Sequence, residues 1–189
     1  PKVAGSRFGY RRHVMVQSRC RMWPLFLSCC GIVALCLPQL ATGERSALGR
    51  SCTAMWRSMY GPGIECRLSA SGFEIIFGFS SAANELVSTV IAKDHDDFMW
   101  MHADEGIPGA HVVIRAPWEL VTVADYHLAS LIASKYSHSG VARFVPKVPV
   151  MCCRSYQVKK LQGAPVGEVL VTGHVETHIV NNVWVEPFL

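Results

Sequence analysis

Short runs of β-branched and aromatic residues, separated by glycine, proline, asparagine and serine, recur throughout residues 61–189. Runs of this length and composition predict strands. Two longer segments instead carry apolar residues at helical spacing, and Ser80 or Ser81 and then Thr122 are suitable N-terminal caps for them. We therefore expect helices at about 80–93 and 122–139. The predicted strands cover 64–68, 73–77, 98–102, 110–115, 148–153, 156–161, 168–172, 177–180 and 183–186.

This order of elements predicts an α+β fold, with a mixed, largely antiparallel sheet and two helices packed against it. The chain has 189 residues, of which 50% are hydrophobic, and this suffices for one domain with its own core. Gly61-Pro62-Gly63 is a cluster of residues that interrupt helices and strands. We therefore expect the folded domain to begin there and to span residues 61–189.

Residues 1–60 differ from the rest of the chain in charge and polarity. They contain nine Lys and Arg residues and one acid, Glu44, which gives a net charge of +8. Residues 23–41 are almost entirely apolar, follow two arginines and precede a stretch of small residues, which is the pattern of a secretory signal peptide. Two prolines bracket this run and shorten it below the roughly 20 residues of a transmembrane helix, which leaves a membrane anchor as the alternative.

The next segment, residues 44–61, is rich in Ser, Thr and Arg and poor in acids, as transit peptides are. A signal peptide followed by such a segment resembles the bipartite leaders that deliver proteins to plastids with additional membranes. We therefore expect residues 1–60 to be a leader outside the fold. The mature protein is then expected in an organelle, in the first place a plastid, with no membrane segment; secretion and a mitochondrial presequence are the alternatives.

Charge in residues 61–189 is segregated along the chain. This part has nine basic residues and thirteen acids, a net charge of −4, so a uniformly basic domain is excluded. Residues 74–125 carry nine acids against Lys93 and Arg115, whereas residues 138–163 carry five cations and no acid. The five cations are Arg143, Lys147, Arg154, Lys159 and Lys160, and the aromatic residues among them are Tyr136, Phe144 and Tyr156. Such a stretch attracts a nucleic-acid backbone and offers rings on which unpaired bases stack. The alternative is an ordinary solvated loop.

An acid and two histidines, Asp97, His102 and His111, raise the question of an enzyme or a metal site. Alternate residues of a strand share a face, so Trp100 and His102 point the same way, with His111 beside them on the neighbouring strand. No third ligand follows from the spacing. The sequence therefore predicts no catalytic residue, no metal and no cofactor, and it favours a structural or ligand-recognition role for these side chains.

The cysteines do not indicate a site either. Five of the eight lie in residues 1–60, and the other three, Cys66, Cys152 and Cys153, form no C-x-x-C pair. We expect no disulfide framework, and we expect Cys152 and Cys153 to be small hydrophobic residues of a strand.

A series of polar and glycine landmarks carries a family resemblance. The series is Asn84-Glu85, Trp100-Met101-His102, Gly109 to Arg115, Val158-Lys159-Lys160, Gly163 and Gly167. In order and spacing it resembles the NFACT-R domain, the nucleic-acid-binding module of the fibronectin-binding protein A and ribosome quality-control factor family, over roughly residues 73–189. Phe79 replaces a basic residue of the family, and two residues instead of one separate Asp97 from Trp100, which predicts a displaced Asp97 or a bulge at the strand entry.

The resemblance implies a stand-alone RNA-binding module, not an enzyme, that associates with tRNA or rRNA and with the large ribosomal subunit. Organelle translation or ribosome quality control is the implied setting. The nucleic-acid-binding residues are expected to be Arg115, Arg143, Arg154, Lys159, Lys160, Trp100, His102, His111 and Asn84. Arg115 is expected either to pair with Asp97 or Asp104 or to bind a phosphate. The alternative function is a protein-interaction module whose acidic face docks a basic, ribosomal partner; a hydrolase that uses the two histidines is a third.

Overall fold

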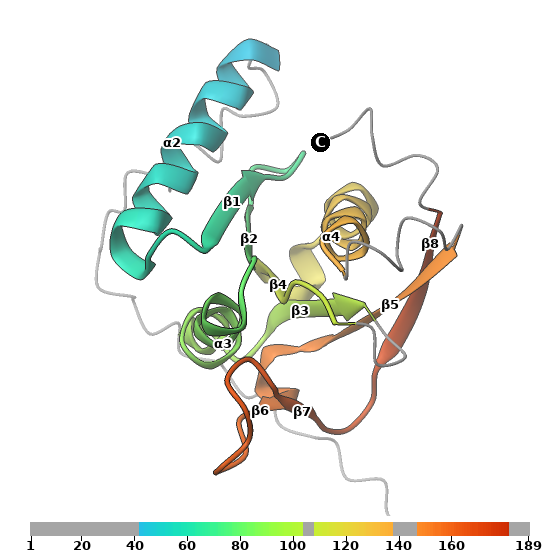
Figure 1. Cartoon of the computed structure of the whole chain (residues 1–189). Coiled ribbons are helices and arrows are strands. Elements are labelled where there is room, and N and C mark those ends of the chain that lie inside the picture. Colours follow the sequence, from blue (N-terminus) through green and yellow to red (C-terminus); the bar gives the residue numbers. More distant parts are fainter. Residues whose placement is uncertain (1–41, 104–107, 138–146, 182–189) are drawn as a thin grey trace, which may run out of the picture.

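The computed structural model describes residues 42–103, 108–137 and 147–181, with side chains from residue 47 onward (Figure 1). Its main sheet has six strands in the order β1-β2-β4-β3-β5-β8, and every neighbouring pair is antiparallel. The strands are β1 (Ile64–Leu68), β2 (Glu74–Gly78), β3 (Phe98–Ala103), β4 (Val112–Pro117), β5 (Lys147–Arg154) and β8 (Glu176–Asn181). A two-stranded sheet of β6 (Val158–Lys159) and β7 (Leu170–Val171) lies beside it. The predicted α+β class is confirmed.

Three α-helices flank the main sheet: α2 (Thr42–Tyr60), α3 (Ser81–Thr89) and α4 (Val123–Lys135). The predicted caps are confirmed, because Ser80 Oγ accepts a hydrogen bond from the Ala83 amide, and Thr122 and Asp125 form a capping box. Three short 3₁₀ helices, η2 (Ile91–Asp94), η3 (Trp118–Leu120) and η4 (Ser155–Gln157), complete the described elements. The predicted first helix thus ends earlier and continues as η2, and the predicted strand 183–186 lies outside the described residues.

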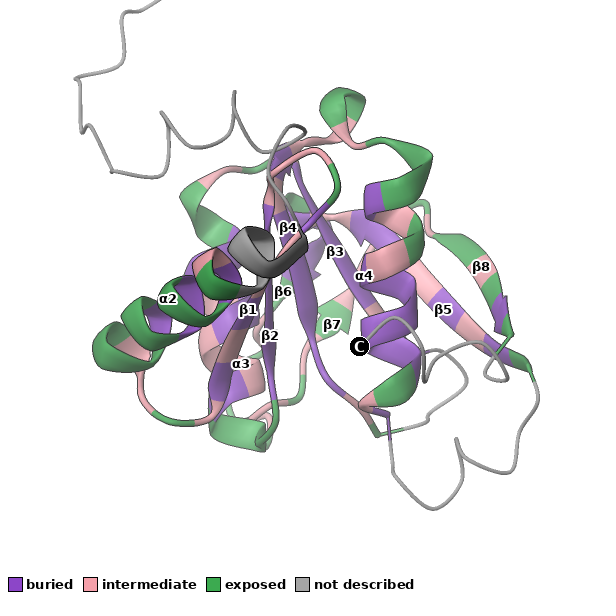
Figure 2. Cartoon of the chain, turned by 90° about the horizontal axis from the view of Figure 1, so that it is seen from above, coloured by how far each residue is buried: buried purple, intermediate pink, exposed green. Residues whose placement is uncertain are grey.

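Strand alternation divides the core into two layers. On one face of the sheet Ile75, Phe77, Met99 and Met101 pack with α4. On the other face Ile76, Trp100 and Val113 pack with α2 and α3. Seen from above, the purple buried strands separate α4 from α2 and α3 (Figure 2). Because period 2 sends successive side chains to opposite faces, both faces of each central strand must be apolar.

The start of β3 is irregular. Phe98 is paired with Pro117 but the next residue, Met99, with Ile114, so the register shifts between them. Between these two pairs β3 advances by one residue and β4 by three, so the unpaired residues, Arg115 and Ala116, lie on β4. The expected displacement of Asp97 or bulge at the entry of β3 therefore stays a prediction.

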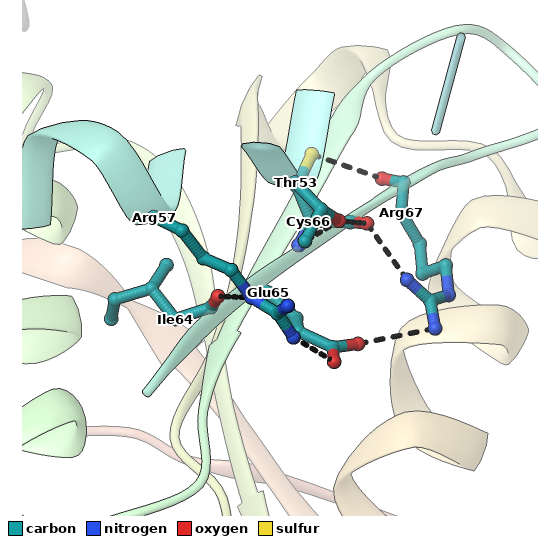
Figure 3. A network of polar contacts seen from close by, with 6 residues as sticks. All are labelled: Thr53, Arg57, Ile64, Glu65, Cys66 and Arg67. Atoms are coloured by element: carbon teal, nitrogen blue, oxygen red, sulfur yellow. Dashed lines mark hydrogen bonds and ion pairs between the residues drawn. The ribbon is translucent and has the colours of Figure 1, made fainter. Parts of the chain in front are cut away.

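Helix α2 occupies residues that the sequence assigns to a leader outside the fold. Its buried Cys52 and Trp56 belong to the core layer beneath α3, and Thr53 Oγ1 hydrogen bonds to both the amide and the carbonyl of Cys66 in β1. Figure 3 shows this contact together with that of Arg57, which reaches the Ile64 carbonyl and Glu65. The domain therefore includes residues 42–60, because Cys52 and Trp56 stand one helical turn apart on a single buried face.

Among the described residues no helix is both long and apolar enough to cross a membrane. The apolar run 23–41 lies outside those residues, so the predicted signal peptide stays a prediction.

Candidate nucleic-acid interface

The predicted recognition side chains Trp100, His102 and His111 lie together where β3 and β4 meet α3. The ring centroids of His102 and His111 are 5.0 Å apart, and Trp100 stacks on His102 at 5.9 Å. The predicted juxtaposition of the two histidines is thus confirmed. Trp100 and His111 are, however, buried, with exposed fractions of 1% and 5%.

Polar partners from α3 occupy the ring nitrogens of this cluster. Trp100 Nε1 donates to Ser88 Oγ at 2.9 Å, and Ser88 Oγ is 2.7 Å from His111 Nδ1. Asn84 donates through its side-chain amide to the Gly109 carbonyl and accepts from the His111 backbone amide. These groups therefore hold α3 against the sheet.

Burial, and secondarily the neighbouring His102, lowers the pKa of His111 to about 3. The imidazole is neutral at physiological pH. His111 therefore contributes no positive charge to an RNA phosphate, and its place in the fold is that of a buried hydrogen-bonding group.

Arg115 has partners other than those expected from the sequence. Its guanidinium forms ion pairs with Glu74 at 2.7 Å and Asp94 at 3.1 Å, and lies 5.1 Å from the Trp56 ring centroid. The expected pairing with Asp97 is wrong, because Asp97 is the partner of Arg154; Asp104 lies outside the described residues. The side chain of Arg115 points to the sheet face that α2 covers, where no helix was predicted.

Lys160 is fully engaged within the fold. Its ammonium group donates to Glu85 at 2.7 Å and to the carbonyls of Pro165 and Glu168 at 2.6 and 3.3 Å. Glu85 also accepts from the Gly167 amide at 2.8 Å. The hydrogen bonds from Lys160 and then Gly167 lower the pKa of the Glu85 carboxyl. Lys160 and Gly167 thus hold the loop 160–168 against α3 through Glu85, which is far from them in the sequence.

Arg154 lies over the ring of Trp118, 5.1 Å from its centroid, and forms ion pairs with Asp97 and Glu119. These contacts fix the guanidinium plane at the end of β5. Arg143, another predicted cation, lies outside the described residues.

Lys159 is the predicted cation that stays available. Its side chain is exposed, and its ammonium group makes no hydrogen bond or ion pair with any residue in the described ranges. Tyr156, three residues earlier in η4, is 55% exposed. Both side chains line the same groove.

A groove of about 440 Å³ runs past these two side chains. Its walls include Trp118, Arg154, Tyr156, Lys159, His174 and Glu176. Gln157 fixes its shape by donating to the carbonyls of Thr172 and His174, at 2.9 and 2.5 Å. Beneath it, the Lys93 ammonium donates to the carbonyls of Ser155 and Val158, and burial lowers the pKa of Lys93.

Sequence reasoning names Arg154, Tyr156 and Lys159 but misses Trp118, Gln157 and His174. Those three reach the groove from η3, η4 and the segment after β7, which are separated by long stretches of sequence. The sequence signal for this surface was the group of cations and aromatic residues in 138–163, which includes Arg154, Tyr156 and Lys159.

No protein-family model matches the chain. The Rqc2 homolog RqcH of Bacillus subtilis is 36% identical over 112 residues, which are 58% of this chain and 18% of RqcH. Among solved structures, the C-terminal part of the fibronectin/fibrinogen-binding protein from Streptococcus suis matches with a TM-score of 0.56 and 26% identity, over 64% of this chain and 45% of that one. The chain thus corresponds to less than half the length of either relative.

Both matches agree with the family resemblance that the landmark residues predict. The RqcH match adds sequence identity over 112 residues to that resemblance. We conclude that this chain is homologous to a part of RqcH and to the C-terminal part of the Streptococcus suis fibronectin/fibrinogen-binding protein.

Proposed function

We propose that the chain is an RNA-binding module and that RNA enters the groove lined by Tyr156 and Lys159. The observation that carries this proposal is the pairing of an exposed ring with a cation that has no partner among the described residues. A free ammonium group gains a phosphate contact without breaking an ion pair. An exposed ring gives an unpaired base a stacking surface.

Arg154 has a positioning role in this proposal. Asp97 and Glu119 hold its guanidinium over Trp118, so it forms a flat wall of the groove. Glu119 is itself 67% exposed, so an incoming phosphate competes with it for one edge of the guanidinium.

The remaining predicted residues serve RNA binding through the fold. Asn84, Trp100 and His111 join α3 to the sheet, and Lys160 ties the loop after β6 to α3. We therefore propose that Lys159 binds the phosphate, whereas its neighbour Lys160 holds the backbone in place.

Ion pairs within the fold weaken the alternative hypothesis, in which an acidic face docks a basic protein. Arg115 forms ion pairs with Glu74 and Asp94, Arg154 with Asp97 and Glu119, and Lys160 with Glu85, so these three cations offset part of the charge of the five acids. Asp125 is used in the cap of α4. Six of the nine acids in residues 74–125 thus have partners within the fold, which leaves a much weaker field for a basic protein.

Homology to RqcH supports association with tRNA or rRNA on the large ribosomal subunit as the cellular setting, without a catalytic step. We place this role in an organelle, with a plastid favoured, on the composition of the first 60 residues, in which a Ser-, Thr- and Arg-rich segment follows the apolar run 23–41. Import of a fluorescent fusion carrying residues 1–60, compared with a fusion that carries residues 1–41 alone, tests the location.

The binding test uses the full chain with labelled tRNA and labelled single-stranded RNA over a series of salt concentrations. We expect affinity to fall steeply with salt, and Lys159→Ala to weaken binding to all sequences and reduce the slope of log K against log salt by about one. Lys147→Ala is the matched control, since Lys147 is an exposed lysine at the opposite end of β5 and should leave both quantities unchanged.

Two results contradict the proposal. One is absence of RNA binding at low salt by the folded wild-type chain. The other is equal binding by the wild type and the Lys159→Ala variant, which moves the phosphate contact away from the groove.

A further inference from the structure

Two thiols from different elements lie in direct contact beneath helix α2. Cys52 Sγ of α2 and Cys66 Sγ of β1 are 2.7 Å apart, with exposed fractions of 8% and 0%. Both belong to the core layer that Trp56, Ile76 and Trp100 complete. This separation exceeds the length of a covalent S–S bond by only about 0.7 Å, since that bond measures roughly 2.05 Å.

We propose that Cys52 and Cys66 are a redox-active dithiol that closes to a disulfide and thereby fastens α2 to β1. The backbone of Cys66 is already held next to α2, because Thr53 Oγ1 hydrogen bonds to its amide and its carbonyl at 3.1 and 2.7 Å. Closing the bond requires the two sulfurs to approach each other by about 0.7 Å.

The Glu74 carboxylate lies beside the two thiols and can accept a proton from Cys52. Cys52 Sγ donates to Glu74 Oε1 at 3.0 Å. Trp56 Nε1 donates to the same oxygen at 3.2 Å, and Arg115 donates to the other oxygen of Glu74 at 2.7 Å. Glu74 is therefore fixed in orientation, with Oε1 toward the thiol that is nearer to solvent.

The oxidant is a small-molecule disulfide, and the reaction is thiol–disulfide exchange. Cys52 transfers its proton to Glu74, and the thiolate attacks one sulfur of the oxidant, so that a mixed disulfide forms and one thiolate leaves. Cys66, after losing its proton, attacks Cys52 Sγ and releases the second thiolate. In sum, two protein thiols are oxidised by two electrons, the small disulfide is reduced to two thiols, and the protons end on the products.

A metal ion fits the same cluster less well. The ligand atoms of Cys52, Cys66 and Glu74 lie within 4.8 Å of one another. Two sulfurs on one tetrahedral zinc ion, each bonded at about 2.3 Å, stand well over 3 Å apart, so the observed contact leaves no room for the ion. Both oxygens of Glu74 also already accept hydrogen bonds from Trp56 and Arg115.

The adjacent pair Cys152 and Cys153 is an internal control. These residues of β5 point to opposite faces of the sheet, Cys152 into the layer with α4 and Cys153 into the layer with α2 and α3. Burial raises the pKa of the Cys152 thiol far above its ordinary value and that of Cys153 to about 12. They are therefore expected to stay reduced under conditions that oxidise Cys52 and Cys66.

The test treats the folded full chain with oxidised glutathione over a range of redox potentials, followed by alkylation and peptide mapping without reduction. We expect a linked peptide pair that joins Cys52 to Cys66, while Cys152 and Cys153 are alkylated as free thiols after unfolding. Oxidation should slow hydrogen exchange of the α2 and β1 amides by about 100-fold, because a short closed loop restricts opening.

The Cys66→Ser variant separates this mechanism from general oxidation, since Cys52 then stops at the mixed disulfide with glutathione. Three results overturn the proposal: both thiols remain free in the folded chain at the most oxidising potential, either one links preferentially to another cysteine, or the purified chain carries one stoichiometric zinc ion that is released only when Cys52 and Cys66 are alkylated. Circular dichroism of each variant confirms that it is folded before its result is used.

Discussion

Lys160 and Glu85 are 75 residues apart in the sequence and form an ion pair of 2.7 Å that joins the loop after β6 to helix α3. The contact turns two landmarks of the family into one structural unit, because Gly167 donates its amide to the same carboxylate oxygen. It also explains why two adjacent lysines, Lys159 and Lys160, have different roles.

The Glu85 contact makes the loop sensitive to acid. Hydrogen bonds from Lys160 and Gly167 lower the pKa of Glu85 in the folded state. A carboxyl with a lowered folded pKa stabilises the fold above its unfolded pKa of 4.5, and this contribution is lost as the pH falls through the folded value. We expect Glu85→Gln to remove this part of the acid sensitivity and to speed hydrogen exchange in residues 161–168 at neutral pH. An unchanged exchange rate contradicts the idea that Glu85 holds this loop against α3.

Substitution of Gly167 tests how closely the loop 160–168 approaches α3. It has φ of +85°, and a Cβ atom there would stand 2.8 Å from the Cα and carbonyl oxygen of Ser81. Gly163 has a similar φ of +80° but open space around it, so it is a matched control. Gly163→Ala is expected to cost about 1 kcal/mol in free energy of unfolding, from left-handed backbone strain alone. Gly167→Ala should cost clearly more, as measured by urea unfolding; equal costs argue against the close approach.

The buried, neutral His111 should make the domain less stable in mild acid. Burial lowers its folded pKa from 6.5 to about 3, so the unfolded chain binds the proton more readily. Its contribution is therefore complete above pH 6.5 and decreases as the pH falls from 6.5 toward 3, by about 2 kcal/mol at pH 5. Urea unfolding at pH 7 and pH 5 measures this. In His111→Gln the difference between the two pH values should shrink by that amount, whatever the variant loses at pH 7.

Arg115 should govern stability and not RNA affinity. Arg115→Met leaves Glu74, whose side chain is only 9% exposed, without its cationic partner. We expect a loss of about 2–3 kcal/mol in free energy of unfolding, because a largely buried carboxylate that loses its cationic partner is costly, even with the hydrogen bonds from Cys52 and Trp56 retained. The double variant Arg115→Met, Glu74→Gln should recover part of the loss. Unchanged salt-dependent RNA binding by the folded Arg115→Met variant is expected; weakened binding with unchanged stability contradicts this assignment.

Stacking in the groove is tested through Tyr156. Its ring is 55% exposed, so Tyr156→Ala should leave stability nearly unchanged and weaken binding of single-stranded RNA by about 1–3 kcal/mol. Tyr156→Phe keeps the ring and should bind like the wild type. If alanine and phenylalanine weaken binding equally, the hydroxyl rather than the ring makes the contact.

Local sequence patterns were enough to predict the main strands, the two helix starts and the relation to RqcH. Alternation of apolar residues predicted β1 to β5 within one or two residues at each end, and Ser80 and Thr122 marked the beginnings of α3 and α4. These signals are local, since strand period, helix spacing and caps depend on residues a few positions apart. The order of landmark residues predicted the relation that RqcH confirms.

The partners of the charged landmark residues became visible only in the folded chain. The pairing of Arg115 with Glu74, of Arg154 with Asp97 and of Lys160 with Glu85 spans 41 to 75 residues, and no local pattern records which acid meets which cation. Helix α2 was assigned to a leader because Ser, Thr and Arg dominate its composition, whereas its place in the core depends on one narrow face with Cys52 and Trp56. The contact between Cys52 and Cys66 follows from that docking, because burial of the apolar face of α2 on β1 brings the two sulfurs together.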